Sequence, residues 1–192
     1  MMNNSNRVIR NSIRSAAVLV FLAGAAPTWA GAGKAGHGHG HGDHGAMGAI
    51  GEAGKAADVT RTITVTMIDN LYDPENITVK AGETIRFKIV NKGEFLHEFG
   101  LGTAAMHKKH QAEMMKMWEH GMNEADRINH DKMKMDHGDG HAMKHDDPNS
   151  ILLEPGKSGE IIWKFTQPTK LEFACNIPGH YESGMMGEIR FK

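Results

Sequence analysis

The alternation of apolar and polar residues in the segment TRTITVTMI, residues 60–68, is the feature that most restricts how this chain can fold. Ile63, Val65 and Met67 are separated by threonines, and a period of two places such side chains on one face of a β-strand. Further strands are expected at residues 77–79, 84–90, 95–99, 151–153, 159–165, 170–174 and 187–191. Turn sequences such as DPEN, KAGE and NKGE separate them. The chain is therefore predicted to be all-β, a Greek-key β-sandwich, because roughly ninety residues of strand and turn sequence match one such domain.

The strand pattern is interrupted between residues 103 and 150 by a segment rich in Met and His. Good helix formers dominate AAMHKKHQAEMMKMWEHG, and Gly121 follows, so a helix is predicted over residues 104–120. The rest of the segment is polar apart from its methionines, and we expect a flexible loop there. The prediction is one sandwich domain at 59–192 with a partly helical insert at 103–150.

The first thirty residues have the pattern of an export signal. Three arginines within residues 7–14 precede an apolar run at 16–26 and a small-residue cleavage site at 28–30. The apolar run is shorter than the roughly 20 residues of a membrane span, so the mature protein is expected to lack one. These features predict a signal peptide at 1–30 and a periplasmic protein. Removal of the signal peptide leaves 19 basic against 23 acidic residues, a net charge of −4, which does not indicate a nucleic-acid partner.

Residues 31–58 are rich in Gly and Ala and include the run HGHGHGDHG. A segment with so little apolar content cannot form a core, so a disordered arm is expected. The run contains His37, His39, His41 and His44.

The chain has a single cysteine, together with 13 histidines and 14 methionines. In an exported protein an unpaired cysteine is a stray thiol, an intermolecular crosslink or a metal ligand, and this composition favours a ligand. Cys175, His180 and Met185 are spaced five residues apart, and His97 is the only histidine between residues 59 and 102. Two imidazoles, a thiolate and a thioether suit copper in both of its oxidation states.

The motif Cys-x4-His-x4-Met near the carboxyl end, with an upstream His after an NKG turn, resembles the cupredoxins of the plastocyanin and azurin type. The segments FACNIPGHYESGMMGEI and LHEFG, with the His-rich arm, look most like periplasmic cupredoxins associated with copper tolerance. The resemblance implies one type 1 copper held by His97, Cys175, His180 and Met185. Met186 competes for the axial role, and family spacing favours Met185. The sequence departs from the family at Glu98, where plastocyanins and azurins usually have an Asn that joins the two ligand loops.

Other interpretations of the metal-binding residues stay open. A structural zinc site is the chemical rival, although zinc generally uses more Cys or His and rarely Met. The four arm histidines could bind additional copper weakly or form a solvated tail. In the predicted helix, Met106, His110, Met114 and Met117 fall near one face, where they could capture Cu(I) or pack against the sandwich.

Two functions compete on these features. The first is a periplasmic copper-binding protein of copper tolerance or homeostasis, with copper ions and copper exporters as partners and Cu(I) oxidation left open. The alternative is a mobile one-electron carrier between redox partner proteins. A multicopper enzyme is disfavoured, because there is one Cys and one β-domain. The abundance of His and Met in the periphery favours copper tolerance.

Overall fold

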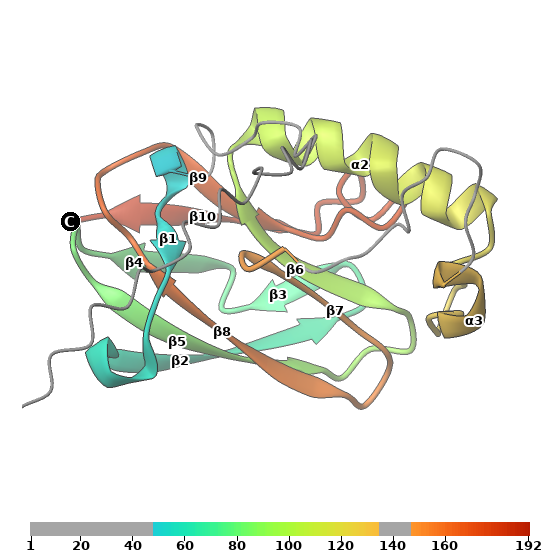
Figure 1. Cartoon of the computed structure of the whole chain (residues 1–192), viewed down its shortest axis with the longest axis horizontal. Coiled ribbons are helices and arrows are strands. Elements are labelled where there is room, and N and C mark those ends of the chain that lie inside the picture. Colours follow the sequence, from blue (N-terminus) through green and yellow to red (C-terminus); the bar gives the residue numbers. More distant parts are fainter. Residues whose placement is uncertain (1–47, 135–146) are drawn as a thin grey trace, which may run out of the picture. The chain divides into compact units, whose positions relative to one another are not determined.

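Two five-stranded sheets pack against each other in the computed structural model, which describes residues 48–134 and 147–192 (Figure 1). The first sheet has the order β1-β8-β5-β2-β3, formed by Glu52–Ala53, Ser158–Lys164, Thr84–Asn91, Arg61–Ile68 and Leu71–Asp73. The second has the order β4-β10-β9-β6-β7, formed by Asn76–Val79, Met186–Phe191, Leu171–Ala174, His97–Gly102 and Ser150–Leu153. The predicted all-β sandwich with a partly helical insert is confirmed.

The alternating segment that dominates the sequence forms β2. Val65 and Met67 are buried, and Thr62 and Thr64 are exposed, as the period of two requires. β2 runs parallel to β5 and antiparallel to β3, a short strand that was not predicted. Aromatic side chains of both sheets pack together in the core between them. The ring centroid of Phe87 in β5 lies 5.4 Å from that of Phe99 in β6.

The strands that carry or flank the candidate ligands lie in the second sheet. β9 pairs antiparallel with β6 on one side and with β10 on the other. All residues of β6 and β9 are buried, because the other sheet covers one face of these strands and the helix α2, Ala104–Glu119, contacts both of them (Figure 1). β6 begins at His97, two residues later than the predicted strand, and extends to Gly102.

The insert leaves the sheet after β6 and returns in β7, the antiparallel neighbour of β6. Thr103 caps α2 by accepting a hydrogen bond from the N–H of Met106 at 3.3 Å, and the helix ends before Gly121, whose φ of 65° favours glycine. The expected flexible loop is wrong for residues 122–134. Met122 is fully buried, and this part includes the short helix α3, His130–Met133.

The predicted disorder of the arm at 31–58 is wrong for residues 48–58. Ile50 is buried and its carbonyl accepts a hydrogen bond from Nε1 of Trp163 at 3.1 Å. β1 then pairs with β8, and a 3-10 helix, η1, follows at Ala56–Asp58. The signal peptide at 1–30 and the four arm histidines lie outside the described residues. Within the described part of the chain, no helix is long and apolar enough to cross a membrane.

Candidate metal centre

The loop between β9 and β10 carries three of the four predicted ligands. Cys175 follows β9 directly, and its N–H donates to the carbonyl of Met185 at 3.1 Å, which closes the loop. The Met185 N–H donates to the carbonyl of His180 at 3.0 Å, and Gly184 provides the positive φ of 97° that the turn requires. The nine residues between Cys175 and Met185 are thus folded back on themselves.

The fourth predicted ligand, His97, comes from the adjacent strand. The register of β6 on β9 pairs Gly100 with Ala174, so the start of β6 lies beside the beginning of the loop. The Glu98 N–H donates to Sγ of Cys175 at 3.3 Å. Strand pairing therefore brings together residues that are 78 positions apart in sequence.

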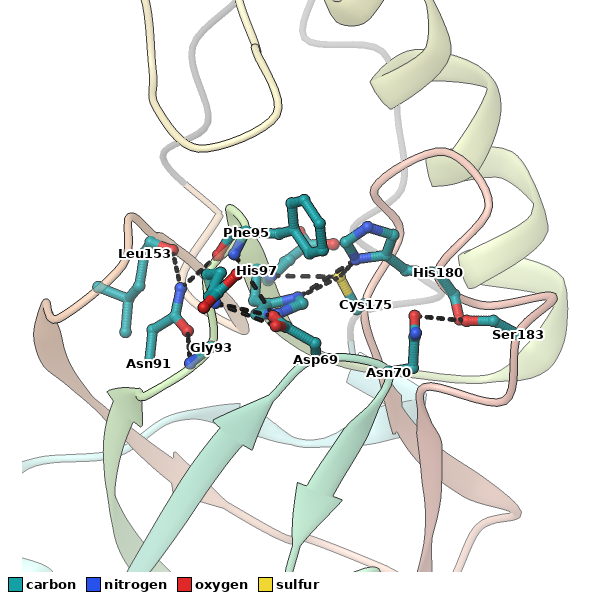
Figure 2. Close-up of polar contacts among 12 residues, drawn as sticks. Asp69, Asn70, Asn91, Gly93, Phe95, His97, Leu153, Cys175, His180 and Ser183 are labelled. Carbon is teal, nitrogen blue, oxygen red and sulfur yellow. Dashed lines mark hydrogen bonds and ion pairs between the residues drawn. The ribbon is translucent and has the colours of Figure 1, made fainter.

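His97, Cys175 and His180 converge on one point (Figure 2). Their ligand atoms all lie within 4.8 Å of one another, and they form the one such group of His, Cys, Asp and Glu found among the described residues. Nδ1 of His180 lies 3.2 Å from Nδ1 of His97 and 3.4 Å from Sγ of Cys175, and Sγ lies 4.0 Å from Nδ1 of His97. These separations suit donors that share one ion at about 2.0 to 2.3 Å.

The donor set fits copper better than it fits structural zinc. Two nitrogens and one sulfur form the His2Cys arrangement of type 1 copper sites, whereas closed zinc sites have four N, S or O ligands. Met185 is fully buried at the end of the loop, and Met186 begins β10 and is only half-buried. The site is compatible with one type 1 copper.

Burial sets the protonation of the candidate ligands in the metal-free protein. It lowers the pKa of His180 to about 4, with a further contribution from His97, and it lowers the pKa of His97 against the opposing effect of Asp69. Burial also raises the pKa of Cys175 to about 12. At neutral pH both imidazoles are therefore neutral and ready to ligate, and the thiol has to lose its proton when a metal binds.

Glu98, the departure from the family pattern, is fully buried and joins the two ligand segments. Its carboxylate accepts hydrogen bonds from the backbone N–H of Asn176 at 3.1 Å and from its side-chain amide at 2.8 Å. It also accepts one from the Ser150 hydroxyl at 2.8 Å and lies 3.0 Å from Nε2 of His110 in α2. The sequence revealed the missing Asn but not these partners, because they come from three separate segments.

Asp69 is a polar neighbour of the centre that the sequence reasoning missed. Its Oδ1 lies 2.9 Å from Nε2 of His97, the ring nitrogen that faces away from Cys175. Residue 69 lies in a turn after β2, and no spacing rule connects it with residue 97.

The four residues on the predicted helix face do not gather around a common point of their own. Met114 and Met117 are buried in the hydrophobic core, and Met106 packs against it. His110 has its two ring nitrogens 3.0 Å from carboxylate oxygens of Glu98 and Glu113. This arrangement favours the packing interpretation of the methionines.

Comparison with known proteins places the chain in a family. A family profile described as a cupredoxin-like domain matches residues 45–116. The copper-resistant cuproprotein CopI of Pseudomonas aeruginosa is 51% identical over 147 residues, which cover 73% of this chain and 81% of that protein. The protein of the same name from Rubrivivax gelatinosus is 40% identical over 147 residues, 76% of this chain and 75% of that protein.

Solved structures agree on the fold. Auracyanin B matches with a TM-score of 0.53 at 18% identity, over 74% of this chain and 96% of that chain. That similarity concerns the fold alone, whereas the sequence identity to CopI extends over most of both chains. The chain belongs to the CopI family of cupredoxin-like proteins.

Proposed function

We propose that this protein serves copper tolerance by binding one type 1 copper ion through His97, Cys175, His180 and Met185. The observation that carries the proposal is the convergence of two imidazoles and the single thiol within 4.8 Å. Membership in the CopI family supports the same role, because the relatives are named copper-resistant cuproproteins. Copper bound there would supply a centre that alternates between Cu(I) and Cu(II).

Each of the four residues would contribute one donor atom to the ion. His97 and His180 present neutral nitrogens, Cys175 supplies the thiolate, and the buried Met185 supplies a thioether as the weak axial donor. Burial of His97, Cys175 and Met185 keeps bulk water from the donors. The role that follows is sequestration of copper, and conversion of an organic substrate is not part of the proposal.

We further propose that the protein acts in the periplasm. The support is the arginine-rich start, the apolar run at 16–26 and the small-residue site at 28–30. In that compartment the partners would be copper ions and the proteins that export them.

Replacement of Cys175 tests the proposed function. The copper-loaded wild-type protein should show strong thiolate-to-copper absorption in the visible range, and Cys175→Ala should abolish it, because the chain contains no other thiol. In a strain that lacks the protein, the wild-type chain should restore growth on copper plates and the variant should restore less.

Ser183→Ala is the matched control, since it changes one small polar group of the same loop, whose hydroxyl contacts Asn70 and the backbone carbonyl of His180, and leaves all four proposed ligand side chains in place. An intense visible band that survives in Cys175→Ala would contradict the assignment. Equal growth of strains carrying Cys175→Ala and wild type would contradict the tolerance role of the centre. A loss of respiratory rate without copper sensitivity would favour the electron-carrier alternative.

A further inference from the structure

The carboxylate of Asp69 lies directly behind one of the proposed copper ligands. Asp69 follows the last residue of β2, and its Oδ1 is 2.9 Å from Nε2 of His97 (Figure 2). The other ring nitrogen, Nδ1, faces His180 and Cys175. The imidazole of His97 thus bridges a carboxylate on one side and the metal centre on the other.

The carboxylate is held in this position by the turn that precedes β6. Asp69 accepts hydrogen bonds from the backbone N–H groups of Glu94 at 3.0 Å and Phe95 at 3.4 Å. The side chain of Asn91 fixes the same turn, because it accepts from the Gly93 N–H at 2.9 Å and donates to the Phe95 carbonyl at 2.8 Å. Asp69 therefore has a defined orientation although its side chain is 30% exposed.

Gly93 provides the space in which the two side chains meet. A Cβ at this position would collide with Oδ1 of Asp69 and would lie 2.8 Å from Nε2 of His97. Any other residue would displace one of the two partners. A glycine at this position therefore leaves room for the contact between Asp69 and His97.

We propose that Asp69 is a positioning residue that biases the copper centre towards Cu(II). By accepting a hydrogen bond from Nε2–H, it fixes the tautomer of His97 that leaves Nδ1 free to ligate. A carboxylate behind a ligating imidazole also makes that imidazole a stronger donor, which benefits the more highly charged ion. The inference rests on the proposed function in one respect, namely that His97 is a copper ligand.

The test compares the reduction potential of copper-loaded wild type with that of Asp69→Asn. Asparagine has the same size and an oxygen that can still accept from the Glu94 and Phe95 amides, so the turn should persist, but it lacks the negative charge. We expect Cu(II) affinity to fall about tenfold relative to Cu(I) affinity, the lower end of what loss of such a partner costs. For a one-electron couple this equals a rise of about 59 mV in the potential.

Two further variants separate the hydrogen bond from the loss of charge. Glu182→Gln removes one negative charge near His180, from an exposed side chain, and should shift the potential much less. Gly93→Ala keeps the carboxylate but forces Asp69 and His97 apart, and should raise the potential as Asp69→Asn does. An unchanged potential in both Asp69→Asn and Gly93→Ala would overturn the inference, and so would an equal shift in Glu182→Gln.

A measurement without metal keeps this inference distinct from the proposed function. Nitrogen NMR of the metal-free wild-type protein should show His97 as the Nε2–H tautomer, and the proportion of that tautomer should fall in Asp69→Asn. The Nδ1–H tautomer in wild type would overturn the inference even if copper binds. If wild type bound no copper while His97 showed the expected tautomer, the proposed function would fail and the contact with Asp69 would stand.

Discussion

Glu98 shows how far a single residue can be interpreted from sequence. The resemblance to plastocyanin and azurin identified the position as one where an Asn usually joins the ligand loops. In the structure the longer, acidic Glu98 makes that connection through Asn176, and its carboxylate also contacts Ser150 and His110. Local spacing pointed to Cys175 and His180, and His97 was chosen as the only histidine between residues 59 and 102; the structure brings these three side chains together. Local spacing could not select Asp69, whose contact depends on the packing of two turns.

Met185 and Met186 are adjacent candidates for the axial ligand, so their variants permit a matched comparison. Met185 is fully buried at the end of the ligand loop, whereas Met186 belongs to β10 and is half-buried. Replacement of a weak axial thioether alters the potential and the visible spectrum of a type 1 site without removing the ion. We expect Met185→Leu to change both and Met186→Leu to change neither, as measured by voltammetry and absorption. The reverse result would assign the axial role to Met186.

Among the elements, the helix α2 shows best why sequence patterns were only partly sufficient. Its bounds were predicted within one residue, because good helix formers and the following Gly121 are local signals. Its effect on the sheet was not predicted, since α2 covers β6 and β9 and makes them buried on both faces. β1 was missed for a different reason. It has two residues, and it is held in place by Ile50 against Trp163, 113 positions away in sequence.

The contact of α2 with the rest of the domain should make stability depend on pH. Burial alone would lower the pKa of His110, but hydrogen bonds to Glu98 and Glu113 outweigh it and raise the pKa to about 9 from 6.5. The charged imidazole therefore contributes stability that is complete below about pH 6.5 and is lost as pH rises through 9. We expect roughly 3 kcal/mol of this dependence in urea unfolding of the metal-free wild type.

His110→Gln should remove that dependence and should be less stable than wild type at pH 6. His130→Gln is the control, because His130 is an exposed histidine in α3. A wild-type protein whose stability is flat between pH 6 and 10, or a control that behaves like His110→Gln, would contradict the role given to the ion pair between His110 and Glu98.

For the whole molecule, the candidate copper centre belongs to the sandwich. The sandwich fixes one centre by joining β6 to the loop between β9 and β10. The insert departs from the end of β6, so its helix lies against the same sheet, and the burial of Met114 and Met117 indicates that it contributes packing. Additional capacity for copper would then depend on the arm histidines.

Deletion of residues 36–45 is the experiment that tests this dependence at the scale of the whole protein. Four imidazoles spaced along a Gly-rich segment can bind Cu(II) without any contribution from the core, so the deletion should lower the copper bound per chain and leave the visible spectrum unchanged. Copper content is measured after dialysis, and tolerance is measured on plates. A chain with His37, His39, His41 and His44 all changed to Gln controls for length and should behave like the deletion.

Met114→Leu with Met117→Leu should keep wild-type copper content, because leucine preserves the packing. Equal copper content with and without the arm would show that its histidines are only a tail, and loss of copper in the Met variant would transfer the auxiliary role to the helix.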